Sequence, residues 1–153
     1  RLCLPAGPLR ELIKPALKRA QFLIIVFYDK TKIKKMYNDI KIDTLTASIE
    51  PLYVDKNKKY LAFSGIGNNQ SFFDTLINNN YAVPKTVEFP DHHFFTEDEL
   101  KHLKKMASDN NLYLITTEKD FVRIPEEKRK GIECLKVKIK LSNMDEFMHK
   151  LVN

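Results

Sequence analysis

The chain alternates between short apolar runs and segments whose apolar residues recur at helical spacing. The run FLIIVFY at 22–28 is rich in β-branched and aromatic residues, which is typical of a strand buried on both faces. Between 71 and 78, Phe72, Phe73, Leu76 and Ile77 fall on one helical face. From the repeated strand–loop–helix order we predict an α/β fold, a three-layer sandwich with a mostly parallel sheet.

The same patterns predict the remaining elements. Thr96 begins TEDE, and Glu99 three positions later completes the signature of a capping box at a helix start. LKVKIKL at 135–141 alternates strictly and predicts one half-exposed strand with its lysines outward. The other expected strands are 45–54, 60–65, 86–89 and 111–116, and the other helices are 11–20, 32–38 after Thr31, and a last one from Ser142 or Asn143 that turns Met144, Phe147, Met148, Leu151 and Val152 inward.

Charge and cysteine content narrow the class of protein. The 153 residues carry a formal charge of +6, which favours anionic partners, but the lysines are too scattered for a dedicated nucleic-acid arm. Cys3 and Cys134 form no CxxC, which fits a reducing compartment. We find no signal peptide, and the longest apolar run is far shorter than the roughly 20 residues that span a bilayer. The opening at Arg1 reads like the interior of a domain, so we expect a piece of a longer protein.

Three polar loops follow predicted strands: GIGN at 65–68, PDHH at 90–93 and TTEKD at 116–120. In a parallel sheet they meet at one edge, where α/β proteins bind ligands. Gly65 and Gly67 allow positive φ and close backbone approach, and a tight strand-to-helix turn is the simplest interpretation. Gln70 replaces the third glycine of GxGxxG, so a Rossmann fingerprint fails, and the chain has no GxxxxGK[ST].

The PDHH loop permits three interpretations. A metal site is disfavoured because adjacent histidines on an extended loop point in different directions. Asp91 beside His92 is plausible as an acid–base element, because a carboxylate can fix an imidazole tautomer and raise its basicity. In the structural alternative, Asp91 caps backbone amides. Both histidines, His92 and His93, are then solvated.

Two further motifs are open to both functional and structural interpretation. In TTEKD, Thr116, Thr117 and Asp120 can cap a following short helix, while Lys119 is placed to meet phosphate. In GPLRE, Arg10 follows a rigid Pro–Gly–Pro turn and could bind phosphate bidentately, with a surface ion pair as the equal alternative.

Taken together, LPAGPLRE, AFSGIGN followed by SFF, FPDHHFFT and TTEKDFVR occur in a familiar order and at familiar distances. They resemble the C-terminal half of the tetraacyldisaccharide 4'-kinases, the lipid A kinases of Gram-negative bacteria. The resemblance extends from Arg1 to about Ile124, and the last strand and helix agree with it.

The resemblance implies a two-domain P-loop kinase with a two-stranded linker. Residues 1–43 would be the remnant of the N-terminal kinase domain, 44–64 the linker and entry to the second domain, and 65–153 the C-terminal α/β domain. The implied reaction transfers the γ-phosphate of ATP, with Mg²⁺, to the 4'-hydroxyl of a tetraacyldisaccharide 1-phosphate. It takes place at the cytoplasmic face of the inner membrane, to which the enzyme is peripheral.

The resemblance also implies residue roles. His92 would complete an Asp–His dyad with an aspartate of the N-terminal part, with Asp91 as support, and Arg10 and Glu11 would line the same cleft. Without a P-loop, we expect the chain to be inactive alone, with ATP and Mg²⁺ bound mainly by the N-terminal half. Asn69 and Leu12 stand where the family often has proline.

Two alternatives belong to other functional classes. One is a non-catalytic α/β module that binds phosphorylated lipid or nucleotide. The other is a metal phosphoesterase built on the DHH triplet, which predicts manganese binding but lacks a convincing set of further aspartates.

Overall fold

A computed structural model describes residues 11–26, 42–52, 55–142, 144 and 147–149. The chain divides into two compact units, Glu50–Lys138 and a second unit made of Arg1–Ile49 with Ile139–Asn153.

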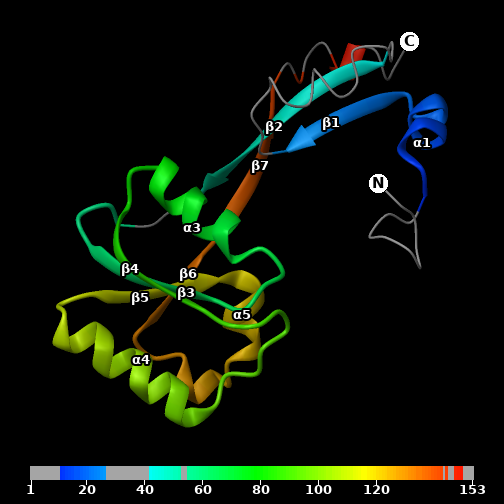
Figure 1. Ribbon diagram of the computed structural model, residues 1–153. Coiled ribbons are helices and arrows are strands. Elements are labelled where there is room, and N and C mark those ends of the chain that lie inside the picture. Colours follow the sequence, from blue (N-terminus) through cyan, green and yellow to red (C-terminus); the bar gives the residue numbers. More distant parts are fainter. Residues whose placement is uncertain (1–10, 27–41, 53–54, 143, 145–146, 150–153) are drawn as a thin grey trace. The chain divides into compact units, whose positions relative to one another are not determined.

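The unit Glu50–Lys138 is built on a four-stranded sheet in the order β4-β3-β5-β6 (Figure 1). Every pair of neighbouring strands in it is parallel, as the strand–loop–helix order predicts. The strands are β3 (Lys59–Ser64), β4 (Ala82–Glu88), β5 (Tyr113–Thr117) and β6 (Ile132–Leu135).

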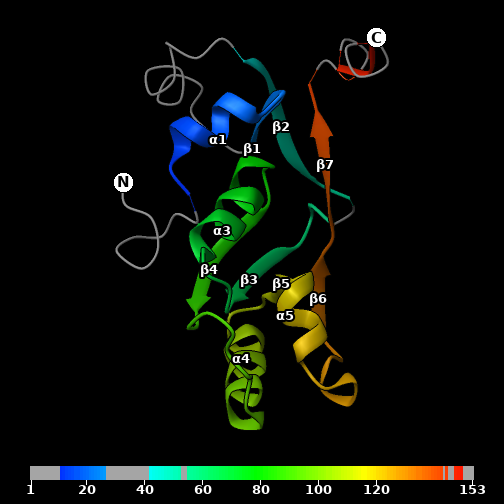
Figure 2. The same cartoon turned by 90° about the vertical axis from the view of Figure 1, so that its right-hand side faces the viewer.

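Helices cover both faces of this sheet, which gives three layers (Figures 1 and 2). Successive residues of β3 point to opposite sides, so Tyr60 and Ala62 join one core cluster and Leu61 and Phe63 the other. The first cluster contains the buried face of α3, and the second that of α4. The helical elements are α3 (Asn69–Asn78), α4 (Glu97–Asp109), α5 (Glu118–Arg123) and the 3-10 turn η1 (Glu126–Lys128). The α/β sandwich prediction is confirmed.

The helix starts follow the predicted caps. Thr96 and Glu99 form the complete capping box of α4. The predicted apolar face of α3 needs one correction, because Ile77 is 53% exposed and Thr75 is buried in its place. At roughly 100° per residue, Ile77 falls outside the arc centred on Phe72 and Leu76.

A second sheet has the order β1-β2-β7, with β1 (Phe22–Val26), β2 (Asp43–Pro51) and β7 (Val137–Leu141). Helix α1 (Ile13–Arg19) precedes it, with Pro15 in its first turn, where proline is tolerated. Burial of the first strand on both faces is wrong for the described residues 22–26, since none is buried and Ile24 is 45% exposed. An apolar run favours burial, but the layers packed against a strand decide it.

The strand predicted at 135–141 is confirmed over 137–141, but it does not include Leu135. β6 ends at Leu135 and β7 begins at Val137, and the two strands belong to different sheets. Strict alternation therefore continued across a change of sheet. Ile139, on the side of β7 opposite the lysines, is 64% exposed, so both sides of this strand face solvent there.

The strands predicted within 44–64 exist as β2 and β3, but they lie in different sheets. The two compact units divide after Ile49 and after Lys138, whereas the predicted domain boundaries are at 43 and 64. The domain boundaries stay a prediction. The predicted helix at 32–38 with its cap Thr31, and Leu151 and Val152, lie outside the described residues. The inward orientation predicted for Met144 and Met148 is wrong, since they are 47% and 50% exposed. Among the helices that the structure describes, none has the length and apolarity needed to cross a membrane.

Candidate functional site

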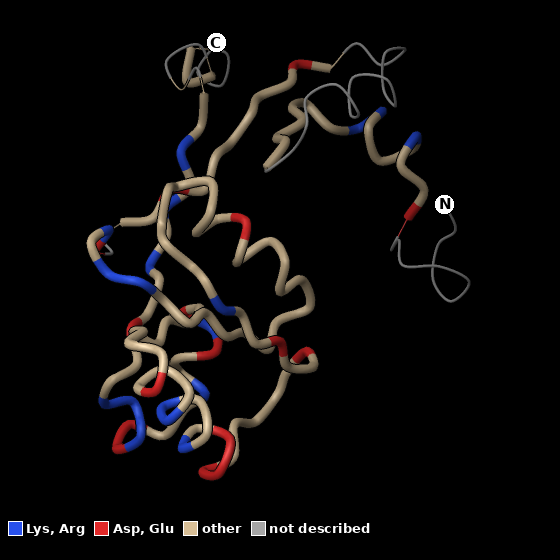
Figure 3. Tube along the Cα trace, turned by 60° about the vertical axis from the view of Figure 1, so that its left-hand side comes forward, with Lys and Arg blue, Asp and Glu red and all other residues tan. Residues whose placement is uncertain are grey.

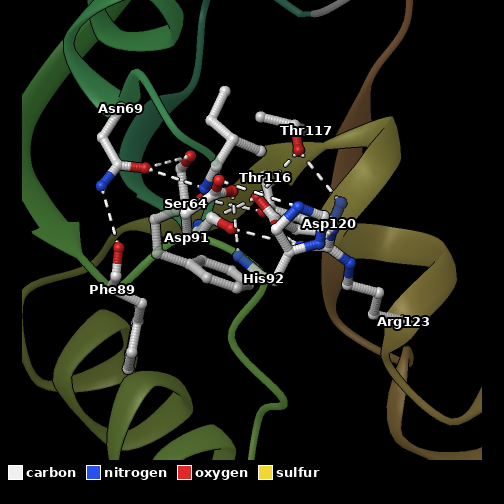
Figure 4. Close-up of polar contacts among 12 residues, drawn as sticks. Ser64, Asn69, Phe89, Asp91, His92, Thr116, Thr117, Asp120 and Arg123 are labelled. Carbon is white, nitrogen blue, oxygen red and sulfur yellow. Dashed lines mark hydrogen bonds and ion pairs between the residues drawn. The ribbon is translucent and has the colours of Figure 1, made fainter. Parts of the chain in front are cut away.

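Three loops meet at the carboxyl edge of the parallel sheet, as predicted (Figure 4). The N–H of Phe89 donates to the carbonyl of Ser64 at 2.8 Å, which extends the pairing of β4 with β3 beyond the strands. The N–H of His92 donates to the carbonyl of Gly65 at 3.1 Å. The N–H of Gly65 in turn donates to Asp120 Oδ2 at 3.0 Å. A backbone hydrogen bond thus joins GIGN to PDHH, and the side chain of Asp120 joins TTEKD to GIGN.

Gly65 and Gly67 serve close approach and not positive φ. A Cβ on Gly65 would lie 3.0 Å from the Cβ of His93 and 3.1 Å from the carbonyl oxygen of Pro90. A Cβ on Gly67 would lie 3.2 Å from Asp91 Oδ2. Glycine therefore lets the GIGN turn pack directly against the PDHH loop.

The positive φ belongs to His92, at 61°. Only a few per cent of residues other than glycine adopt this left-handed conformation, although histidine does so more often than most. Two hydrogen bonds hold the backbone there: the His92 N–H contacts both the Gly65 carbonyl and Asp91 Oδ1, the latter at 2.9 Å.

The carboxylate of Asp91 is therefore a backbone cap. Its Oδ2 lies 3.7 Å from His92 Nε2, which is beyond hydrogen-bond distance. This geometry matches the structural alternative for Asp91. It does not show Asp91 fixing the imidazole tautomer.

Arg123 contacts the imidazole instead. Its Nη2 lies 3.0 Å from His92 Nδ1, while its Nη1 donates to the Gly65 carbonyl at 3.2 Å and to Asp120 Oδ1 at 3.3 Å (Figure 4). A guanidinium has only donors, so Nδ1 must accept and the neutral ring carries its proton on Nε2. The His92 side chain is 71% exposed, and Arg123 is largely buried at 16%.

Asp120 is fully buried and organises this edge of the sheet. Its Oδ2 accepts from Gly65 N–H and, at 2.8 Å, from the hydroxyl of Thr117, which itself caps α5 by accepting the Asp120 N–H. The predicted capping role is confirmed for Thr117. It is wrong for Thr116, whose buried hydroxyl donates to the Phe63 carbonyl at 2.8 Å.

Asn69 ties the GIGN turn to the end of β4. Its side-chain oxygen accepts from the Ser64 hydroxyl at 2.8 Å and from the Ile66 N–H at 3.1 Å, and its amide donates to the Phe89 carbonyl at 3.0 Å (Figure 4). A proline could make none of these bonds.

His93 belongs to the scaffold. Its Nε2 lies 3.0 Å from the Glu99 carboxylate, and its ring stacks on Phe89 with centroids 4.8 Å apart. The backbone N–H of Thr96 first, and His93 second, lower the pKa of Glu99. His93 thus connects the loop to the capping box of α4 and not to the cluster around His92.

The other sequence-predicted residues are only partly described. Arg10 lies outside the described residues. Glu11 is exposed and forms an ion pair with Arg19, and the two interpretations of Arg10 stay predictions. Over the part of the chain that the structure describes, no group of three or more His, Cys, Asp or Glu side chains could hold a metal ion. Basic and acidic residues are interspersed along the described chain (Figure 3). Glu97, for example, forms ion pairs with Lys101 and Lys128.

A sequence model of the tetraacyldisaccharide-1-P 4'-kinases matches residues 1–153. The chain belongs to this family. The curated tetraacyldisaccharide 4'-kinase of Rickettsia typhi (strain ATCC VR-144 / Wilmington) is 37% identical over 146 residues, which are 95% of this chain and 45% of that protein. The one from Rickettsia bellii (strain OSU 85-389) is 38% identical over 144 residues, or 92% of this chain and 44% of the relative.

A solved structure gives the same family. The crystal structure of the "apo" form of LpxK from Aquifex aeolicus in complex with ATP is 26% identical, with a TM-score of 0.61. The similarity covers 98% of this chain and 47% of that one. The chain thus spans about half the length of the tetraacyldisaccharide 4'-kinases that it matches.

Sequence reasoning missed the connections that Asp120, Arg123 and Asn69 make. The signal was present in TTEKDFVR, where Asp120 and Arg123 are three apart and so share a helical face. What no local pattern supplied was that this face meets His92, 31 residues away.

Proposed function

We propose that the chain is the C-terminal portion of a tetraacyldisaccharide 4'-kinase, which transfers the ATP γ-phosphate to the 4'-hydroxyl of a tetraacyldisaccharide 1-phosphate. The observation that carries the proposal is the exposed imidazole of His92, held at the carboxyl edge of a parallel sheet in a chain of this family. Ligands of open α/β sheets bind at that edge.

His92 is the proposed catalytic residue, and Asp91 holds its backbone. Phosphoryl transfer depends mainly on positioning and charge neutralisation, with a group that handles the hydroxyl proton. In the tautomer described above, His92 presents Nε2–H at its exposed edge as a donor. Because Arg123 occupies the lone pair at Nδ1, His92 orients a carboxylate through Nε2–H, and that carboxylate takes the hydroxyl proton. A carboxylate from the rest of the enzyme, approaching Nε2, would complete the dyad.

ATP and Mg²⁺ are assigned to the N-terminal part of the enzyme. This chain contains no P-loop sequence, and its described residues offer no cluster of metal ligands. The Aquifex aeolicus relative was solved with ATP, which supports nucleotide binding by the family fold. Mg²⁺ would neutralise phosphate charge when bound. Arg10 is proposed to bind phosphate or substrate and Glu11 to line the same substrate-binding cleft, and the enzyme is proposed to act at the cytoplasmic face of the inner membrane.

The test is a chimera that joins this chain to the N-terminal part of the Rickettsia typhi relative. It is assayed for ATP-dependent phosphorylation of the lipid disaccharide. We expect activity from the chimera, none from this chain alone, and a loss of roughly 100-fold or more in His92→Ala. Full turnover by His92→Ala would end the dyad role. An inactive chimera in which the isolated chain binds the acidic lipid without ATP would favour a non-catalytic binding module.

A further inference from the structure

We infer that Arg123 is the positioning residue for His92: it holds the imidazole in place and fixes its Nε2-protonated tautomer. This inference rests on the proposed function for its consequence in catalysis, and on the contacts of the loop cluster for its geometry. Arg123 contacts the catalytic side chain and not the substrate, so its role is exerted through His92.

The guanidinium is itself rigidly held. Arg123 is only 16% exposed, and its Nη1 is shared between the Gly65 carbonyl and the carboxylate of Asp120, which is fully buried. Asp120 is in turn fixed by Gly65 N–H and the Thr117 hydroxyl. The planar fork leaves Nη2 free to aim at one point, His92 Nδ1.

Among the residues that the structure describes, the imidazole of His92 has no other hydrogen bond. Its nearest carboxylate oxygen, on Asp91, is 3.7 Å from Nε2, and the side chain is 71% exposed. An exposed imidazole on a short loop would otherwise sample several rotamers and both tautomers. The backbone places His92 through its positive φ, and Arg123 then orders the side chain.

This arrangement determines which edge of the imidazole ring donates a hydrogen bond. With Nδ1 occupied, the proton is on Nε2 and the exposed edge of the ring is always a donor. A partner carboxylate that arrives when the two parts of the enzyme close meets a pre-oriented N–H. Pre-orientation matters because a displacement of about 1 Å in an active site can cost roughly 100-fold in rate.

The first test is spectroscopic and uses the full 153-residue chain labelled with ¹⁵N. His92→Gln identifies the imidazole signals of His92, and His93, held by Glu99, is the internal reference. We expect the wild-type Nδ1 signal to show a hydrogen-bonded acceptor. In Arg123→Lys and Arg123→Ala it should move to the position of a free imidazole nitrogen, with His93 unchanged. Lys130→Ala is the control, because it removes an exposed positive charge nearby in sequence.

Arg123→Lys guards against misfolding. An ammonium can remain beside Asp120 and the Gly65 carbonyl, so the buried carboxylate keeps a cation. It cannot also reproduce the separate Nη2 contact. A folded Arg123→Lys chain with an unchanged His92 Nδ1 signal would overturn the inference, whatever the chimera shows.

The second test uses the active chimera. Arg123→Lys should lower kcat roughly 10- to 100-fold with little change in the KM for ATP, and Lys130→Ala should not. In a His92→Ala background, Arg123→Lys should cause no further loss, because a residue that acts through His92 has nothing left to position. An equal loss in both backgrounds would show a structural role and overturn the inference. An inactive wild-type chimera would count against the proposed function, and the spectroscopic test would still decide the placement of the ring.

Discussion

The carboxylate of Asp120 accepts the backbone N–H of Gly65 at 3.0 Å, although the two residues are 55 positions apart. Asp120 is on α5 and Gly65 directly follows β3, so this bond fixes a helix to the end of a central strand. The same carboxylate pairs with Arg123, which contacts His92. The stability of the sheet edge and the geometry of the proposed site therefore depend on one buried group.

Removing that carboxylate should be costly. Asp120→Ala leaves the Gly65 N–H and the guanidinium of Arg123 without their partner, and we expect a loss of about 3–5 kcal/mol in the free energy of unfolding. Asp120→Asn should lose less, because an amide oxygen can still accept the Gly65 N–H. Urea unfolding followed by far-UV circular dichroism measures both. Lys119→Ala, an exposed change on the same helix, is the control, and an Asp120→Ala chain as stable as this control would refute the role.

The left-handed backbone conformation of His92 should lower the free energy of unfolding. At φ 61°, an L-residue pays roughly 1 kcal/mol or more that glycine does not. His92→Gly should therefore have a free energy of unfolding about 1 kcal/mol higher than His92→Ala, although both lack the imidazole. Urea unfolding measures the difference. Equal stability of the two variants would mean that the left-handed conformation is not strained.

Much of the fold could be predicted because it depends on local patterns. The capping box at Thr96 and Glu99 and the strand β3 are specified by a few neighbouring residues. The predictions failed where packing layers decide, as for Ile24 and for the sheet change between Leu135 and Val137.

The site was predictable to the level of its loops and not of its contacts. Parallel strands bring their carboxyl ends together, so the meeting of GIGN, PDHH and TTEKD follows from topology. Whether Asp91 or Arg123 would touch the imidazole depends on rotamers and on differences of less than 1 Å. A sequence pattern does not contain that information.

Asn69 offers a test of a departure from the family pattern. Asn69→Pro introduces the proline that the family resemblance predicts at this position, and proline is well tolerated at the first residue of a helix, the position that Asn69 has in α3. It also removes the three side-chain bonds to Ser64, Ile66 and Phe89. We expect a net loss of about 1–3 kcal/mol, since buried partners are left unpaired. Thermal unfolding measures it, and a variant more stable than wild type would show that the backbone preference outweighs the network.

Glu99 should give the protein a defined acid sensitivity. Hydrogen bonds from the Thr96 backbone first and from His93 second lower its pKa below the ordinary value of 4.5. A carboxyl group whose pKa is lower in the folded state stabilises that state above its unfolded pKa, and the contribution is lost as pH falls through the folded value. Wild type should therefore exceed Glu99→Gln in unfolding free energy at about pH 5.5, by about 1 kcal/mol as for other helix caps, and the gap should close below about pH 4.

Glu97 is the matched comparison for this prediction. Its pKa is lowered from 4.5 to about 2 by the hydrogen bonds of Lys101 and then Lys128. Because these ion pairs are exposed to solvent, they stabilise the folded state much less than this shift alone would indicate. Salt at about 1 M screens exposed charge pairs over a few ångströms. The first partner of Glu99 is instead the neutral backbone N–H of Thr96, at 2.7 Å, which is not a charge pair. In about 1 M salt, which screens exposed ion pairs, the effect of Glu97→Gln on the free energy of unfolding should vanish. The effect of Glu99→Gln should persist. If both effects vanish in salt, Glu99 acts as a surface charge and not as the cap that joins His93 to α4.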